Sequence, residues 1–159
     1  MKIKLICVGR MKEAFYKDAA SEYIKRLSRF HKLEIIEIQE EIKKENPSDA
    51  EIEKALSEES SKILKSLGKG AYIISLAIEG KQISSEDLAD TIKGLSDGGI
   101  SEIDFIIGGS HGISREVLSS SDFLLSFSKM TFTKEMARVI FLEQLYRASK
   151  ITSGETYHK

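Results

Sequence analysis

The sequence lacks several features on which whole classes of protein depend. Its 159 residues contain one cysteine, one proline and no tryptophan. The single cysteine, Cys7, cannot form an internal disulfide, and its place in an apolar segment favours an inert buried thiol over a nucleophile. No stretch approaches the ~20 apolar residues that span a bilayer, and the first residues are too charged for a secretory signal. We therefore expect one cytoplasmic domain, residues 1–159, with no membrane partner.

Metal ligands and net charge are also scarce. His31, His111 and His158 are widely separated and have no cysteine partners, so we expect no bound metal. The 24 basic and 25 acidic residues nearly cancel, which argues against a free-standing binder of bare nucleic acid. The charge is nevertheless uneven, since residues 1–32 carry +6 and residues 129–159 carry +3, against −10 between them. If the two ends meet, they form a basic face for phosphates; solvated helix faces explain the same charges.

Apolar segments alternate with amphipathic segments along the whole chain. This alternation is typical of an α/β fold, a mostly parallel sheet with helices on both faces. Strands are expected at residues 2–8, 32–38, 71–78, 105–107 and 123–127. Helices are expected at residues 14–30, 49–67, 85–96, 114–118 and 133–150.

Local signals mark several boundaries of these elements. Ser48 with Glu51 and Ser84 with Asp87 have the spacing of capping boxes, which begin helices. Residues 79–81, Glu-Gly-Lys, are expected to form a turn. The buried face of the first helix is expected to hold residues that recur at every fourth position, Phe15, Ala19, Tyr23 and Leu27.

The last predicted helix has apolar residues around most of its circumference. These residues are Met136, Ala137, Val139, Ile140, Phe141, Leu142, Leu145 and Tyr146. So small a domain cannot bury all of them unless a second copy of the chain covers the outer side, and this favours a two-fold homodimer. A helix buried centrally within one chain is the alternative.

A glycine-rich loop, Gly108-Gly109-Ser110-His111-Gly112, follows the fourth predicted strand. Glycines allow positive φ and close backbone approach, so the loop suits either a ligand held by main-chain amides or a sharp turn without a ligand. Ser110 and His111 also suggest hydrolase machinery, but the Gly-x-Ser-x-Gly elbow of such enzymes is absent. A flavodoxin-like nucleotide-binding or regulatory module without catalysis is a further alternative.

Four other motifs accompany this loop: Val8–Lys12, Ser126–Phe132, Glu143–Ala148 and the terminal Tyr157-His158. Together the five motifs resemble the bacterial RlmH family of SPOUT methyltransferases over the whole chain. The resemblance implies a carboxy-terminal trefoil knot, an obligate homodimer and S-adenosylmethionine as methyl donor. It further implies that the substrate is N3 of a pseudouridine in the large-subunit (23S) ribosomal RNA of assembled ribosomes.

The resemblance also implies the residues of the site. The cofactor pocket is expected to comprise Leu76, Gly108, Phe127, Ser128, Lys129, Met130, Thr131 and Phe132. Tyr157 and His158 of the partner subunit's tail are expected to complete the catalytic site, with Arg147 nearby contacting RNA.

The chemistry of these side chains suits a methyl transfer. His158 is a candidate general base for the N3 proton, and Tyr157 is suited to orient the base, unless both only bind RNA while solvent takes the proton. The family often has Pro-His where this chain has Thr133-Lys134. Lysine is normally charged, so we expect Lys134 to contact phosphate rather than to transfer a proton.

Overall fold

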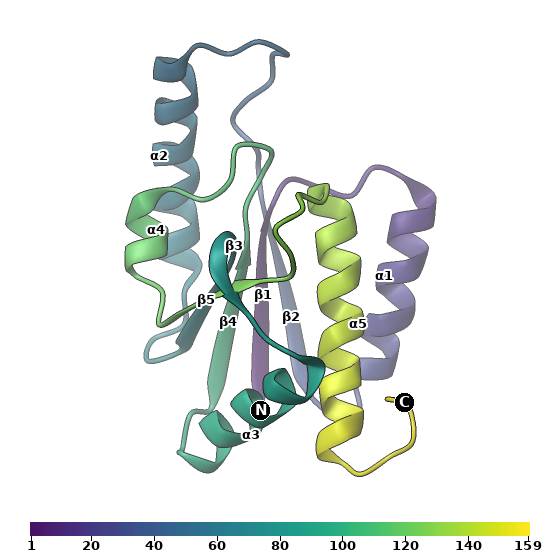
Figure 1. The fold of residues 1–159 in the computed structure, drawn as a ribbon. Helices are drawn as coiled ribbons and strands as arrows, with labels where there is room; N and C mark the ends of the chain where they lie inside the picture. Colours follow the sequence, from purple (N-terminus) through teal and green to yellow (C-terminus); the bar gives the residue numbers. More distant parts are fainter.

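The computed structural model describes residues 1–159 and contains a five-stranded sheet between two layers of helices (Figure 1). The strands are β1 (Lys2–Val8), β2 (Lys32–Ile38), β3 (Tyr72–Gln82), β4 (Glu102–Ile107) and β5 (Phe123–Ser126). All are parallel, in the order β2-β1-β4-β3-β5, so that β1 pairs with β2 on one side and β4 on the other. The predicted α/β fold class is confirmed. Because the strands run the same way, their carboxyl ends meet at one edge of the sheet.

The two helical layers differ in size. The helices are α1 (Ala14–Leu27), α2 (Asp49–Ser66), α3 (Ser85–Asp97), α4 (Arg115–Ser119) and α5 (Lys134–Thr152). In Figure 1, α1, α3 and α5 lie against one face of the sheet, and α2 and α4 lie against the other. None of the helices has the length and apolar character needed to cross a membrane.

Each face of the sheet has its own apolar core because successive strand residues point to opposite faces. The larger core contains Phe105 and Phe141, whose ring centres are 4.5 Å apart. The smaller core contains Ile6 and Ile106 and lies under α2 and α4. Cys7 belongs to the larger core, where burial raises the pKa of its thiol to about 12, as expected for an inert thiol.

The helix starts follow the predicted local signals. The hydroxyl of Ser48 accepts the Glu51 N–H at 3.3 Å, and the Glu51 carboxylate accepts the Ser48 N–H at 3.4 Å. Ser84 and Asp87 make the same reciprocal pair at 3.0 and 3.1 Å. Both predicted capping boxes are therefore confirmed.

The prediction of a turn at residues 79–81 is wrong, because β3 continues through them. The register against β5 shifts at this point, so that Leu76 and Lys81 both pair with Leu125. A Cβ on Gly80 would lie 2.7 Å from the backbone of β5. The glycine therefore permits the close passage of two strands rather than a reversal of the chain.

The predicted buried face of α1 is also wrong in its first half. Phe15 is 63% exposed, whereas Tyr16, Ala20, Tyr23 and Leu27 pack into the larger core. An α-helix has 3.6 residues per turn, so a strict four-residue spacing rotates around the helix by about 40° at each step. The spacing of four, three and four residues stays on one face.

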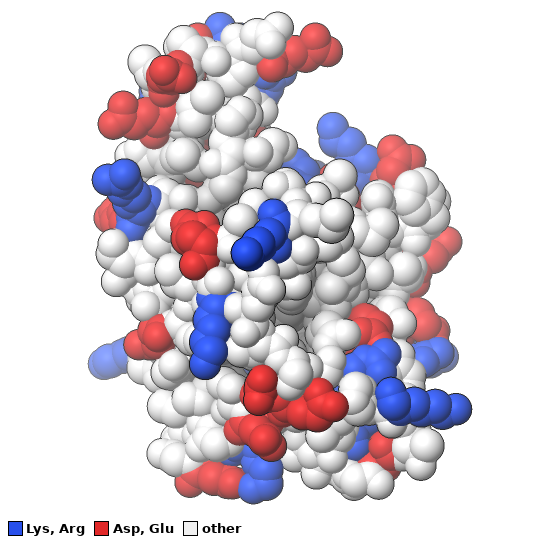
Figure 2. All heavy atoms as spheres, viewed as in Figure 1, with Lys and Arg blue, Asp and Glu red and all other residues white.

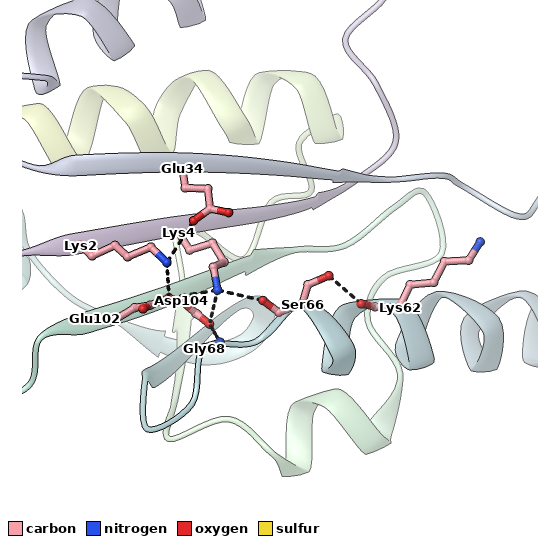
Figure 3. A network of polar contacts seen from close by, with 8 residues as sticks. All are labelled: Lys2, Lys4, Glu34, Lys62, Ser66, Gly68, Glu102 and Asp104. Atoms are coloured by element: carbon pink, nitrogen blue, oxygen red, sulfur yellow. Dashed lines mark hydrogen bonds and ion pairs between the residues drawn. The ribbon is translucent and has the colours of Figure 1, made fainter.

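A buried ion network ties the end of α2 to the amino-terminal half of the sheet (Figure 3). The ammonium group of Lys4 donates to the Ser66 carbonyl at 2.9 Å and lies 3.0 Å from a Glu102 carboxylate oxygen. Asp104 accepts the Gly68 N–H at 2.7 Å. Burial raises the pKa of Asp104, while the hydrogen bond from Lys4 lowers the pKa of Glu102.

Candidate functional site

A cavity opens at the carboxyl-terminal edge of the sheet. It lies where β4 and β5 end, where residues 76–79 of β3 pass by, and where α5 begins, and its volume is about 880 Å³. Open parallel sheets bind ligands at this edge, and small-molecule sites have volumes of roughly 300–1,000 Å³. Eleven of its 23 lining residues are hydrophobic, so it suits a ligand with both apolar and polar parts.

Seven of the eight residues predicted to bind the cofactor line this cavity. They are Leu76, Gly108, Phe127, Ser128, Met130, Thr131 and Phe132. The eighth, Lys129, is exposed and does not line the cavity. The fold thus gathers the middle of β3, the glycine loop and the segment before α5 around one space.

The segment before α5 is ordered by its own serine and threonine side chains. The Ser128 hydroxyl accepts the Met130 N–H at 3.0 Å, and Thr133 caps α5 by accepting the Met136 N–H at 3.3 Å. The side chains of Met130 and Phe132 are nevertheless 74% and 39% exposed. The backbone is therefore fixed while two large apolar side chains remain open for contact.

The glycine loop (Gly108–Gly112) folds tightly on itself. Gly109 and Gly112 form a single β-bridge, and the Gly112 N–H donates to the Gly109 carbonyl at 3.1 Å. A Cβ on Gly108 would lie 2.6 Å from the Gly112 carbonyl oxygen, and Gly112 has a φ of +81°. The glycines are thus required by the turn itself, whether or not a ligand approaches.

Glu40 is a site residue that the sequence did not indicate. One of its carboxylate oxygens accepts the Ser110 N–H at 3.0 Å, and the other forms an ion pair with Lys134 at the start of α5. Burial acts to raise the pKa of Glu40, but the hydrogen bonds from Lys134 and Ser110 outweigh it, so the pKa lies below its usual value. Lys134, which we expect to contact phosphate, lines the cavity and pairs with this carboxylate.

The hydrolase alternative gains no support from the loop. Ser110 and His111 are both exposed, and no hydrogen bond joins their side chains. The Ser110 N–H is already bonded to Glu40. Moreover, no group of three or more His, Cys, Asp and Glu side chains is placed to hold a metal ion.

The three predicted catalytic residues gather toward the other end of α5. The Arg147 guanidinium carbon lies 4.8 Å from the Tyr157 ring centre, and Arg147 Nη1 lies 3.4 Å from His158 Nδ1. Glu143 pairs with Arg147 and accepts the Tyr157 hydroxyl at 3.2 Å, while His158 Nε2 lies 2.7 Å from Glu86. Burial raises the pKa of Tyr157, so its phenol stays protonated. Two carboxylates therefore position the cluster.

Within one chain this cluster is far from the cavity. Ala137 is the last residue of α5 that lines the cavity, and Arg147 lies ten positions further along the helix. At 1.5 Å per residue, the two are separated by about 15 Å along the helix axis. A single chain does not bring the predicted catalytic and cofactor residues together.

The two basic ends of the chain meet, since α1 packs against α5, but they do not form a continuous basic face. Lys134, Arg138, Arg147 and Lys150 each pair with a glutamate. Figure 2 shows basic and acidic side chains interspersed over the face in view. Arg10 and Lys17 have no ion-pair partner and border a smaller cavity of about 420 Å³.

Comparisons with known proteins agree with one another. The family described as "Predicted SPOUT methyltransferase" matches residues 1–158. A Methanococcus maripaludis protein named "Putative ribosomal RNA large subunit methyltransferase H" is 52% identical over 100% of both chains. The "Ribosomal RNA large subunit methyltransferase H" of Bifidobacterium adolescentis is 50% identical, again over 100% of both chains.

Solved structures show the same fold at low sequence identity. A "probable methylase family protein" from Haemophilus influenzae has a TM-score of 0.55 and 12% identity, covering 99% of this chain and 70% of that one. A "putative methyltransferase" from Legionella pneumophila, solved with bound SAM, has a TM-score of 0.51 and 14% identity. It covers 94% of this chain and 66% of its own. At these identities the likeness concerns the fold alone.

Proposed function

Because the chain belongs to the SPOUT methyltransferase family, we propose that it transfers a methyl group from S-adenosylmethionine to large-subunit ribosomal RNA in the cytoplasm, at N3 of a pseudouridine. The observation that carries the proposal is the cavity, around which seven of the eight predicted cofactor residues meet. The names of the relatives support ribosomal RNA as the substrate class. A flavodoxin-like module without catalysis accounts for the sheet but not for the family match.

The cavity suits S-adenosylmethionine in size and in chemistry. The apolar side chains of Leu76, Phe127 and Met130 are available to enclose an adenine, and the glycine loop offers backbone groups to the polar parts. When bound, the cofactor supplies a methyl group on a positively charged sulfur. The work left to the chain is to align the reacting atoms and to exclude water.

The cluster of Arg147, Tyr157 and His158 suits a further task, the removal of a proton from the substrate. N3 of pseudouridine carries a proton that must leave before the nitrogen becomes a good nucleophile. We assign its removal to His158, whose Nε2–H donates to Glu86 and whose Nδ1 faces Arg147. Nδ1 is then the nitrogen that takes the proton, and it does so once its long contact of 3.4 Å with Arg147 gives way to the substrate. A general base contributes about 10²- to 10⁴-fold to a rate. Tyr157, kept protonated, orients the nucleobase by stacking or hydrogen bonding.

We assign the cavity and the cluster of one active site to different subunits of a homodimer. The two lie about 15 Å apart along α5 of one chain, so a tail that serves its own cavity would have to leave its contacts with Glu143 and Glu86. Met130 and Phe132, which line the cavity, and Met136 near them expose apolar surface that suits contact with a second copy.

Binding of the cofactor is the first test. Calorimetry with S-adenosylmethionine should show saturable binding, and the protein should methylate ribosomes from cells that lack it. Mass spectrometry of the RNA should then find one added methyl group on a pseudouridine. A chain that binds no S-adenosylmethionine, or that methylates a different nucleoside, would contradict the proposal.

Mixed dimers test the shared site. Gly108→Arg should destroy the cavity, and His158→Ala should remove the base while leaving cofactor affinity nearly unchanged. Each variant alone should be inactive. After unfolding and refolding together, half of the dimers carry one of each, so about a quarter of the wild-type sites return. If each site lies within one chain, mixing restores nothing.

A further inference from the structure

We propose that Glu40 and Lys134 are positioning residues that latch the glycine loop to the start of α5 and so hold the cavity in its binding shape. This inference rests on the proposed function, in that it takes the cavity to be the cofactor site. It gives a role to Glu40, which no motif marked, and it gives Lys134 a role other than the expected contact with phosphate.

One carboxylate joins two walls of the cavity. Glu40 lies two residues beyond β2 and reaches toward both the glycine loop and α5. It accepts the Ser110 N–H at 3.0 Å with one oxygen and pairs with Lys134 through the other. Both side chains of the ion pair are only 19% exposed, so solvent screens the pair less than it screens a fully exposed one.

Two glycines make room for this latch. Gly9, with a φ of +92°, lies where a Cβ would come 2.7 Å from the Lys134 ammonium group. A Cβ on Gly109 would come 3.0 Å from a Glu40 carboxylate oxygen. Larger residues at either position would push one partner of the ion pair away. Glycine at these two positions therefore leaves the space that the side chains of Lys134 and Glu40 occupy.

Fixing the glycine loop should matter most for ligand affinity. A loop that is already in its bound conformation does not need to be ordered when the ligand arrives. If only a fraction of the molecules hold the loop correctly, the apparent dissociation constant rises in inverse proportion to that fraction. A residue that only stabilised the fold would not act in this way.

The test compares Glu40→Ala with Glu41→Gln as a matched control. Glu41 is the next residue, is also 19% exposed and pairs with Lys62, which does not line the cavity. In Glu40→Ala, the Ser110 amide should exchange its hydrogen faster in the cofactor-free protein, and S-adenosylmethionine should bind about tenfold more weakly. Glu41→Gln should change neither quantity. Glu40→Gln, which keeps an acceptor but loses the charge, should lie between them and guards against misfolding of the alanine variant.

A charge reversal separates the two contacts of Glu40. The double variant Glu40→Lys with Lys134→Glu restores an ion pair, but a lysine has no oxygen to accept the Ser110 N–H. We expect it to recover the midpoint of thermal unfolding relative to either single variant, while its affinity for S-adenosylmethionine stays low. Recovery of affinity would overturn the role of the Ser110 contact.

The outcomes also separate this proposal from the proposed function. Absence of cofactor binding by the wild-type protein would contradict the proposed function, and the exchange rate of the Ser110 amide would still test the latch. An unchanged exchange rate in Glu40→Ala overturns the latch itself. Faster exchange with unchanged affinity overturns its role in holding the binding shape.

Discussion

The guanidinium group of Arg147 lies 4.8 Å from the ring centre of Tyr157, and the carboxylate of Glu143 contacts both side chains. One acidic residue thus orients two of the three predicted catalytic residues. A cation over an aromatic ring favours a fixed ring orientation, and the hydrogen bond that the hydroxyl donates to Glu143 fixes the position of the far end of the side chain. Glu143 should accordingly matter for turnover although we do not expect it to touch the cofactor.

Replacement of Glu143 by glutamine tests this role. The variant keeps an oxygen for the Tyr157 hydroxyl but loses its charge against Arg147, so we expect kcat to fall about tenfold. The dissociation constant for S-adenosylmethionine should stay unchanged. Glu22→Gln is the control, since Glu22 pairs with Arg26 at the same four-residue spacing on α1. Equal loss of kcat in both variants would remove the special role of Glu143.

The glycine loop should tolerate no side chain at Gly108. A methyl group there would lie 2.6 Å from a carbonyl oxygen of the same loop, so Gly108→Ala should destabilise the protein by about 1–3 kcal/mol and weaken cofactor binding. Gly94, inside α3, has open space around it, and Gly94→Ala should stabilise by about 0.5–1 kcal/mol. Urea unfolding and calorimetry measure both effects. Normal cofactor binding by Gly108→Ala would show that the tight turn is dispensable.

The buried network in Figure 3 should contribute to stability but not to binding. Lys4→Met leaves the buried Asp104 carboxylate without its cation, and we expect a loss of about 3–5 kcal/mol in the free energy of unfolding. Lys2→Met removes a more exposed pair with Glu34 and Glu102, and its cost in the free energy of unfolding should be much smaller. Denaturant titrations give both values. If both variants lost the same free energy of unfolding, the burial of Lys4 would not explain its contribution to stability.

His31 should make stability depend on pH. Burial, together with the nearby amino terminus, lowers its pKa from the ordinary 6.5 to about 4. The unfolded chain takes up the proton first as the pH falls through 6.5, so the folded state loses stability from there down to about pH 4. Each pKa unit corresponds to about 1.4 kcal/mol, and partial exposure reduces the total to about 2 kcal/mol.

The matching variant is His31→Gln, which can still bond to Ser149 but cannot titrate. Its free energy of unfolding should vary less than that of the wild-type protein between pH 6.5 and 4. Carboxylates elsewhere contribute equally to both proteins and cancel in the difference. Parallel pH profiles for the two proteins would rule out His31 as the source.

Signals between near neighbours in the sequence predicted local structure well. The capping boxes at Ser48 and Ser84 needed only residues three positions away, and both formed. The turn predicted at Gly80 was wrong because glycine occurs both in turns and where two strands pass closely. Only the position of β5 distinguishes the two cases. The predicted burial of Phe15 was wrong because a four-residue spacing approximates the helical period over a short stretch only.

Contacts between distant residues could not be predicted in this way. Glu40 and Lys134 are 94 positions apart, and nothing in the local sequence of either one indicates the other. The residues that line the cavity could be predicted only from the resemblance to a known family. Hydrophobic periodicity shows where helices and strands form, but it does not show which loops lie close together. The trefoil knot, the dimer and the roles of Tyr157 and His158 stay predictions.

The order of the strands also has a consequence for how the chain folds during translation. β1 can pair with β2 early, but its other edge pairs with β4, and Lys2 lies opposite Glu102. A ribosome must therefore make about two-thirds of the protein before the apolar first strand is covered on both sides. Until then its open edge can pair wrongly with other chains, and such long-range pairing slows folding. We expect nascent forms of this enzyme to depend on chaperones more than its small size suggests.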